Sequence, residues 1–296
     1  MSVKDAAKII DTLISNAEKV KLCYVFTLIE TITSFFSEIT SAQRGSILAV
    51  GLMFFWVLEG FLPFKMFKYN KLKHASTNIF LTLTTIIVNF SLAFLIVLTC
   101  DFISASDFGL LSYLSIVDYP IISILITLML LDLIAAYFSH FVQHKVKILW
   151  TIHMVHHSDK HVDTTTANRH HPIESVIRFF FTLLAIIISE ASIEIVFLYQ
   201  SLSVAFSQFN HANIGLSDKV DKLLSYVIVS PNMHKVHHHS FMPYTDSNYG
   251  NIFSIWDRIF GTYMELDRDK IVFGIDDNYD DKNDIVKILK RPFRKS

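Results

Sequence analysis

Apolar residues are gathered into four long runs along this chain, at 46–64, 78–100, 119–139 and 176–209. At about 1.5 Å per residue, each of the first three is long enough to cross a bilayer core of about 30 Å as a helix. The fourth run is longer still, and Glu190 and Glu194 interrupt it near its middle. We therefore predict three membrane-spanning helices followed by a pair of shorter helices. This pair dips through or partly into the bilayer and has the glutamates at its turn.

The pattern before the first span is less regular. Residues 22–39 are apolar, but Glu30 and Glu38 interrupt them, so an interfacial helix and a spanning helix both fit. Residues 1–21 lack the short apolar core and the cleavage site of a secretory signal. We predict a lead-in over 1–45 and a single domain over 46–296. The fold class is all-α, a polytopic membrane helical bundle.

Lysines set the expected orientation of this bundle. Four of them lie in the short connection between the first two runs, namely Lys65, Lys68, Lys71 and Lys73. Short basic loops mark the cytoplasmic side of a membrane, and the connection 101–109 has no lysine or arginine. Two crossings return the chain to the same side at His140, where Lys145 and Lys147 add positive charge. We predict a multi-pass protein of a bacterial inner membrane or of the endoplasmic reticulum, with a histidine-rich cap in the cytoplasm.

The composition agrees with a membrane protein. The chain has 296 residues, is 52% hydrophobic and 14% aromatic, and has a mean hydropathy of +0.41, which is too apolar for an ordinary soluble enzyme. Its net charge is −1, so no basic surface predicts a nucleic-acid partner. Cys23 and Cys100 both lie in apolar runs, which indicates packing rather than a disulfide framework or a redox pair.

Histidines carry the candidate chemistry. Eight of the 14 lie between Asp132 and Glu174. Three groups have helical spacing: His140 and His144; His153, His156 and His157; and His234, His237 and His238. Imidazole is a good ligand for iron, zinc, copper and nickel. Because a four-coordinate metal takes at most four protein ligands, the surplus predicts two metals in one shared site between helices.

Longer motifs surround these histidines. They are D-L-x-x-x-Y-x-x-H from Asp132 to His140, R-H-H-P-I-E at 169–174, N-H-A-N-I at 210–214, and N-Y-G-x-x-x-x-x-W-D-R-x-F-G-T at 248–262. With the order H-x-x-x-H, H-x-x-H-H and H-x-x-H-H, this set resembles the fatty acid hydroxylase superfamily. That group includes sterol desaturases, carotenoid hydroxylases and alkylglycerol monooxygenases. The resemblance covers roughly Glu59 to Thr262, within the domain predicted over 46–296.

The resemblance implies a membrane-embedded non-haem di-iron centre. Such a centre uses dioxygen and external electrons to hydroxylate or desaturate a lipid. The resemblance also implies that His171 and His211 complete the metal shell formed by the three histidine groups. Zinc is expected as a substitute in purified protein, because it binds such ligands more tightly than ferrous iron. Since the spans, clusters and cap use all the residues, we expect a separate ferredoxin or b-type cytochrome to deliver the electrons.

Two positions depart from the family pattern. Phe141 follows His140 where relatives commonly have arginine, and His239 extends the last group where a serine is usual. The second departure leaves His238 and His239 as alternative ligands. His170 competes with His171 in the same way, although the resemblance favours His171.

Other polar residues are expected to support the metal ligands. Asp132 is a carboxylate in an apolar helix, so we expect it to accept a hydrogen bond from the second ring nitrogen of a ligand. The other candidates for the layer around the ligands are Tyr137, Asn210, Asp257, Glu174 and His161. For the polar residues of this set a structural or capping role is the simpler expectation. The lone His74 is expected to be a satisfied polar residue rather than a ligand.

Two other functions compete with a lipid oxidoreductase. A metal transporter is also rich in membrane histidines, but a permeation path would place its ligands in mid-membrane, whereas these follow the ends of spans. A zinc hydrolase is disfavoured because H-E-x-x-H is absent and the ligands are too many. A sterol-like lipid, an ether lipid and a fatty acyl chain all fit an apolar pocket. The R-H-H-P and N-H-A-N-I segments resemble the sterol desaturases more than the fatty acyl hydroxylases of the family, and this resemblance favours a ring-bearing or ether lipid.

Overall fold

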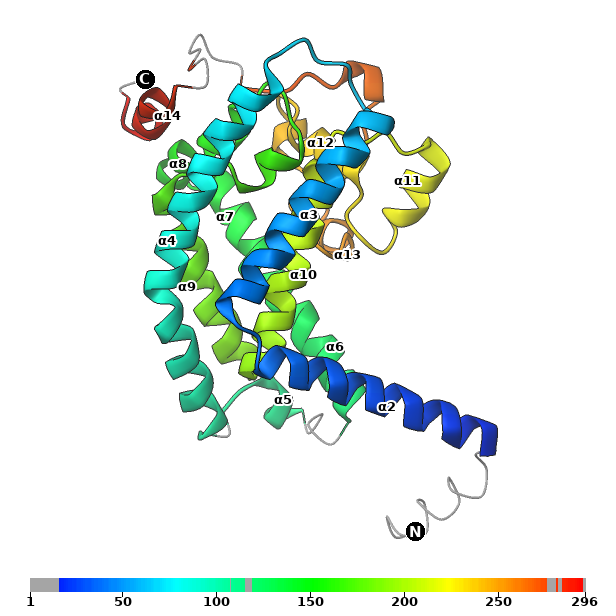
Figure 1. Ribbon diagram of the computed structural model, residues 1–296. Helices are drawn as coiled ribbons and strands as arrows, with labels where there is room; N and C mark the ends of the chain where they lie inside the picture. The colour runs from blue at the N-terminus through cyan, green and yellow to red at the C-terminus, as the bar shows by residue number, and fades with distance from the viewer. Residues whose placement is uncertain (1–15, 107, 115–118, 276–280, 282–283, 295–296) are drawn as a thin grey trace.

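The computed structural model describes residues 16–106, 108–114, 119–275, 281 and 284–294. Every named element in these ranges is a helix, so the predicted all-α fold is confirmed. Among them, four stretches are long and apolar enough to cross a membrane: Ser41–Phe61, Lys71–Ser104, Pro120–Lys145 and Pro172–Ser189. These stretches stand together as a bundle (Figure 1). The multi-pass arrangement expected from the apolar runs is therefore present.

The first span, α3 (Ser41–Phe61), begins earlier than the predicted 46–64 because a capping box fixes its start. Gln43 N donates to Thr40 Oγ1 at 3.2 Å, and Thr40 N donates to Gln43 Oε1 at 2.8 Å. The preceding helix α2 (Asn16–Ser37) is not among the four apolar stretches. It packs against α10 (Ile193–His211) and lies across the lower end of the bundle (Figure 1). The helix predicted over 22–39 corresponds to α2, which ends at Ser37.

The second span, α4 (Lys71–Ser104), has 34 residues, whereas the sequence predicted a helix over 78–100. Asn70 caps it by accepting a hydrogen bond from Lys73 N at 2.9 Å. Lys71 and Lys73 therefore lie in the first turn of the helix and not in a loop, which corrects the prediction. At 1.5 Å per residue such a helix is about 50 Å long, so its first turns reach beyond a bilayer core of about 30 Å.

The third span combines α6 (Pro120–Leu131), a π-helical stretch η1 (Asp132–Phe138) and α7 (Ser139–Lys145) in one continuous rod. The first element starts where predicted, with Pro120 in its first turn. The π-helical stretch has no signature in the sequence. Such stretches are rare and occur mostly at functional sites. Here it leads directly into the helix that carries the first histidine pair.

The fourth apolar run folds into two antiparallel helices, α9 (Pro172–Ser189) and α10, as predicted. Glu190 ends α9 in the left-handed conformation with a φ of 53°, and its Oε2 accepts a hydrogen bond from Ser112 N at 2.6 Å. Ser112 belongs to the short helix α5 (Leu110–Tyr113). The hairpin brings the chain back to the end of the bundle that holds α8 and α12, which we call the histidine end (Figure 1).

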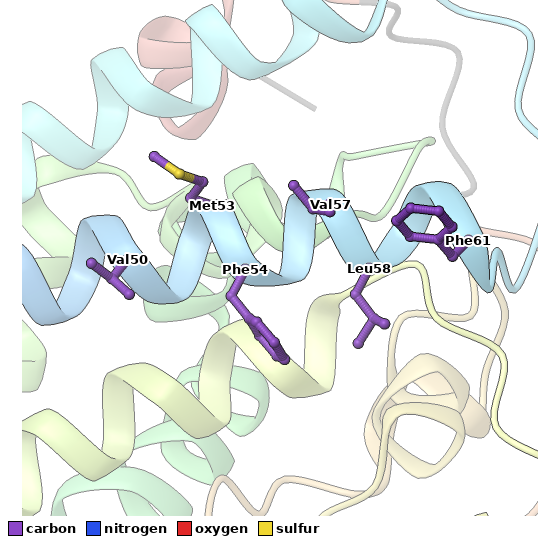
Figure 2. Close-up of a pocket in the computed structure, with 6 residues that line it drawn as sticks. All are labelled: Val50, Met53, Phe54, Val57, Leu58 and Phe61. Atoms are coloured by element: carbon purple, nitrogen blue, oxygen red, sulfur yellow. The ribbon is translucent and has the colours of Figure 1, made fainter.

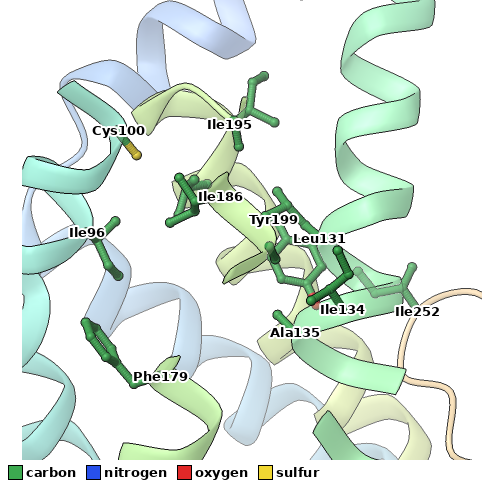
Figure 3. Packing of buried hydrophobic residues seen from close by; sticks show 13 residues of the cluster. Ile96, Cys100, Leu131, Ile134, Ala135, Phe179, Ile186, Ile195, Tyr199 and Ile252 are labelled. Atoms are coloured by element: carbon green, nitrogen blue, oxygen red, sulfur yellow. The ribbon is translucent and has the colours of Figure 1, made fainter. Parts of the chain in front are cut away.

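Short elements cover the histidine end. They are α8 (Lys147–His157), η2 (Thr164–Asn168), α11 (Asp218–Leu224), α12 (Pro231–His237), η3 (Tyr244–Asp246), α13 (Ile255–Ile259), η4 (Arg268–Lys270), α14 (Ile285–Lys290) and η5 (Arg291–Phe293). The main apolar core lies below them, between α4, η1, α9 and α10. Figure 3 shows Phe179 of this core directed toward Ile96, and Tyr199 beside Leu131 and Ile134. This core holds the spans that position the histidines.

The outer face of α3 is apolar and uncovered. Figure 2 shows five of its side chains, Val50, Met53, Phe54, Val57 and Phe61, which are 54% to 77% exposed. Burying such a surface in an apolar phase is favourable by about 25 cal/mol per Å². A bilayer supplies that phase, so this face is a lipid-facing surface of the bundle.

Candidate metal centre

Nine of the ten expected ligands meet in two clusters at the histidine end. The first cluster consists of His140, His144, His153, His157 and His237, and the second consists of His156, His211, His234 and His238. Within each cluster the candidate ligand atoms all lie within 4.8 Å of one another. The clusters adjoin, because the stacked rings of His157 and His238 have centroids 4.7 Å apart. Residues far apart in sequence therefore form one composite site.

Helical geometry explains how two H-x-x-H-H groups serve two clusters. Residues four apart lie on one face of a helix, so His153 and His157 of α8 both point into the first cluster. The intervening His156 points into the second cluster. The C-terminal group reverses this division, because His234 and His238 enter the second cluster and His237 enters the first. Each group thus contributes a pair to one cluster and a single ligand to the other.

The spacing of the ring nitrogens fits metal coordination. Nε2 of His140 lies 3.1 Å from Nε2 of His153, and Nε2 of His211 lies 3.0 Å from Nε2 of His156. His211 Nε2 is also 3.0 Å from that of His234. Donors bound to one metal at about 2.1 Å are about 3.0 Å apart in an octahedron and about 3.4 Å apart in a tetrahedron. The nitrogens are therefore spaced as ligands of a single ion in each cluster.

Several buried nitrogens in the clusters have no hydrogen-bond partner in the structure. They are His144 Nε2, His237 Nε2, both nitrogens of His157, and Nδ1 of His156, His234 and His238. A buried polar atom without a partner costs about 1–3 kcal/mol, so such a concentration is unusual in a folded protein. Metal binding at the nitrogens that face the clusters would remove this cost. The residues present therefore fit the binding of metal ions.

In three of the clustered histidines, the second ring nitrogen contacts an oxygen atom of a residue outside the clusters. Nδ1 of His140 donates to the carbonyl oxygen of Tyr249 at 2.9 Å, and Nδ1 of His237 donates to that of Ser247 at 2.6 Å. Nδ1 of His153 contacts Glu174 Oε1 at 2.9 Å. Such bonds fix the tautomer that leaves Nε2 free to bind a metal, and they orient the ring.

Burial keeps the imidazoles of this site neutral. Removal from water, and then the proximity of other histidines, hold the pKa of five of them well below the usual 6.5, namely His156, His157, His234, His237 and His238. At the rim, burial opposes ionisation of Asp246, but its contacts with His144 and Lys145 hold the pKa of this carboxyl well below its usual range. Neutral imidazole is the form that binds a metal, so the site is ready for metal at neutral pH.

The structure corrects the choice between His170 and His171. The ring of His170 stacks on that of His156 with centroids 4.6 Å apart, and its Nδ1 lies 2.9 Å from Glu174 Oε1. His171 instead caps α9, where its Nδ1 accepts a hydrogen bond from Ile173 N at 3.2 Å and its Nε2 faces the carbonyl oxygen of Leu289. In an R-H-H-P sequence the residue before proline is extended and becomes the cap. His171 is thus directed away from the clusters.

The positions of His238 and His239 in the structure also distinguish these two alternative ligands. His238 lies in the second cluster, whereas His239 Nδ1 accepts a hydrogen bond from Val272 N at 2.9 Å. His161 stacks on Tyr69 with centroids 4.5 Å apart and joins neither cluster. His74 binds two carboxylates, at 2.8 Å to Asp159 and 3.1 Å to Asp163, so it is a satisfied polar residue as predicted.

Asp132 does not support a metal ligand, contrary to our prediction. Its carboxylate accepts hydrogen bonds from Ile252 N at 3.2 Å, Phe253 N at 3.1 Å and Trp256 Nε1 at 3.0 Å. It therefore anchors the loop after Tyr249 to the third span. Because that loop also supplies the carbonyl of Tyr249 to His140, the influence of Asp132 on the site is indirect.

The remaining polar candidates hold the same loop. Asp257 accepts hydrogen bonds from Tyr249 N at 2.8 Å and Gly250 N at 2.9 Å. Tyr137 shares a hydrogen bond of 2.8 Å with Thr262 Oγ1, and Asn210 Nδ2 donates to the carbonyl oxygen of Asn251 at 2.8 Å. Asp257 and Asn210 thus have the structural role that was the simpler expectation. None of these residues contacts a histidine of the clusters in these bonds.

Two carboxylates contact the clusters directly. Glu174 lies against His153 and His170, and Asp246 Oδ1 lies 3.5 Å from His144 Nδ1. The sequence named Glu174 both as a candidate for the layer around the ligands and as a candidate cap, and the structure places its carboxylate against His153 and His170. Asp246 carries no comparable signal, because a long loop brings it to His144.

Comparisons with known proteins agree with this site. Residues 124–262 match the model of the family described as fatty acid hydroxylase. The chain is 31% identical to the alkylglycerol monooxygenase of Homo sapiens over 142 residues, which is 47% of this chain and 30% of that protein. It is 29% identical to the alkylglycerol monooxygenase of Caenorhabditis elegans over 50% of this chain and 29% of that protein.

A bacterial relative is the ornithine lipid hydroxylase OlsE of Rhizobium tropici, which is 22% identical over 43% of this chain and 38% of that protein. The chain thus matches only about a third of the length of the relatives it resembles. No solved structure gives a significant match to this chain. The matched segment contains both histidine clusters from His140 to His238.

Proposed function

We propose that this chain, which carries a fatty acid hydroxylase domain over residues 124–262, is a membrane-bound non-haem di-iron oxidoreductase that hydroxylates or desaturates a lipid. The observation that supports this most is the pair of adjoining clusters of nine histidines, seven of them buried, at one end of the spans. Relatives named as monooxygenases and lipid hydroxylases favour this reading over a metal transporter. The ligands lie at the end of the bundle rather than along a path through it.

We infer that the two clusters hold two iron ions, with zinc as a substitute in purified protein. The chemistry that bound iron supplies is reductive activation of dioxygen. The contribution of the chain is positional: the carbonyl oxygens of Tyr249 and Ser247 orient His140 and His237, and Glu174 orients His153. Burial of the second cluster keeps water away from the reacting groups.

The substrate in this proposal is a sterol-like lipid, an ether lipid or a fatty acyl chain that enters from the bilayer. Reduction of dioxygen also needs electrons from outside the chain. We propose that a separate ferredoxin or b-type cytochrome delivers them at the histidine end, where Lys145 and Lys147 are exposed. An acidic carrier would be attracted to such a surface.

The proposed function predicts a missing lipid product. We expect cells that lack this protein, and cells that carry His156→Ala, to lose one lipid that differs from its precursor by one oxygen or by two hydrogens. Lipid mass spectrometry of the two altered strains against the unaltered strain measures this. Unchanged lipids together with altered cellular metal content would contradict the proposal and favour a transporter.

We also propose that the histidine end faces the cytoplasm, which predicts a labelling pattern. In a background with Cys23→Ser and Cys100→Ala, single cysteines at Lys160 and Met242 should be protected from an impermeant thiol reagent added to intact cells. Both positions are exposed at the histidine end. A cysteine at Ala105, which is exposed at the end of α4, is the positive control.

Permeabilised cells should label all three cysteines. If only one of the Lys160 and Met242 positions reacted in intact cells, the hairpin of α9 and α10 would not return the chain to the side it left. If both reacted and Ala105→Cys did not, the bundle would have the opposite orientation.

A further inference from the structure

Arg178 is a charged residue on the inward face of a membrane-spanning helix. It lies in α9, four residues after Glu174 and seven before Ala185, so the three side chains project from one side of the helix. Glu174 and Ala185 are fully buried. The lipid-facing side of α9 is different, because Phe180 and Leu184 there are 62% and 45% exposed. Arg178 therefore faces the interior of the bundle.

The side chain of Arg178 is nevertheless 36% exposed. Since its neighbours on the same face are buried, this exposed part borders a space inside the bundle and not the surrounding lipid. This face of α9 is turned toward α10, because Ala185 on the same face packs in one core with Ile195 and Tyr199 of α10. An arginine with solvent-accessible surface is thus directed between the two helices of the hairpin.

This space is next to the metal centre. Nη1 of Arg178 lies 3.8 Å from Glu174 Oε1, and the same oxygen lies 2.9 Å from Nδ1 of His153. Side chains of a helix lean toward its N-terminus, which for α9 is the histidine end. Only one carboxylate therefore separates the guanidinium from a ligand of the first cluster.

Glu174 does not satisfy Arg178. The contact of 3.8 Å is longer than a hydrogen bond, and Oε1 of Glu174 is already shared by His153 and His170 at 2.9 Å each. Among the described residues, Glu174 supplies the one carboxylate within 4.0 Å of this guanidinium. A cation within a membrane span is costly unless it serves a function, and arginine has five donors arranged to bind carboxylate or phosphate in pairs.

We propose that Arg178 binds the anionic group of the lipid substrate, a carboxylate or a phosphate, in the space between α9 and α10. The inference rests on the proposed function and narrows its substrate to an anionic lipid.

Lipid binding tests this inference without relying on turnover. Native mass spectrometry in neutral detergent can compare the affinities of the metal-loaded protein for oleate, dioleoyl phosphatidic acid and a neutral 1-O-alkylglycerol. We expect Arg178→Gln to weaken binding of the preferred anionic lipid by about tenfold or more, the usual worth of a charge-assisted contact, and to leave the neutral lipid unchanged. Arg178→Lys should restore part of the loss. Tighter binding of oleate would assign a carboxylate, and tighter binding of phosphatidic acid a phosphate.

Arg44→Gln is the matched control. This arginine also lies in a span, but its guanidinium stacks on Phe197 at 4.3 Å near the start of α3, far from the histidine end (Figure 1). It should keep the native affinities. Equal binding of anionic and neutral lipids by the native protein, or an unchanged affinity in Arg178→Gln, would overturn the inference even if a lipid is oxidised. Selective loss of anionic binding in a protein that oxidises no lipid would support it and overturn the proposed function.

Discussion

His237→Ala should lower the metal content of the purified protein from about two ions to one or fewer and should reduce lipid oxidation by about 100-fold or more. Removing residues that merely orient a ligand costs 10–100-fold in metal affinity or activity, so loss of a ligand is expected to reach at least the upper end of that range. His237 is fully buried, and its Nε2 has no other partner. Elemental analysis and turnover with a supplied electron donor measure the two effects.

A parallel variant probes the other cluster. His234→Ala removes a ligand candidate of the second cluster and should have an effect of similar size. His161→Ala is the control, because His161 stacks on Tyr69 outside both clusters and its loss should leave two metals bound. Retention of both metals by either cluster variant would show that the clusters are not the metal site.

Removal of the metals should lower the apparent melting temperature by about 10 °C or more. Several buried ring nitrogens have no partner except a metal, and each such atom costs about 1–3 kcal/mol when unsatisfied. A loss of several kcal/mol corresponds to a shift of about 2–4 °C per kcal/mol in a chain of this size class. Thermal unfolding before and after chelation, with ferrous iron or zinc added back, measures the shift. An unchanged melting temperature would mean that the clusters are satisfied without metal.

The metal-free protein should also lose stability in mild acid. In the folded state the pKa of His157 and His238 lies well below 6.5, whereas in the unfolded chain it is near 6.5. The unfolded state therefore binds more protons as the pH falls below about 6.5, and stability decreases there. Above about pH 7.5 these two histidines are neutral in both states, so they no longer contribute to the pH dependence. A melting temperature that stays constant down to pH 5 would contradict this.

Much of the fold could be predicted because its signals are local. Apolar runs of sufficient length specify spans, and Glu190 marks a turn within a run that is too long for one helix. The helix starts were less predictable, since α4 begins at its Asn70 cap inside what reads as a basic loop. The π-helical stretch from Asp132 could not be predicted, because it depends on packing against the rest of the bundle.

The part of the site that could be predicted is the part that helical spacing reveals. Histidines repeated at three and four residues reveal their own grouping, so spacing named eight of the nine clustered histidines in advance, and the family resemblance added His211. The backbone and side-chain groups that hold these histidines in place could not be predicted, because their contacts join segments distant in sequence. Asp132 illustrates the limit, since its bonds to Phe253 and Trp256 cross more than a hundred positions. His171 illustrates a second limit, because a resemblance in sequence does not decide whether the ring of His170 or that of His171 faces the clusters.

The division of each H-x-x-H-H group between the two clusters constrains how this chain can change in evolution. Inserting one residue between His153 and His156 would rotate His156 and His157 by about 100° relative to His153. Because His156 serves one cluster and His157 the other, such an insertion would disturb both at once. The loops between the groups face no such restriction. Descendants of this sequence can therefore vary in the lengths of their connections, while the spacing within each group must be inherited unchanged.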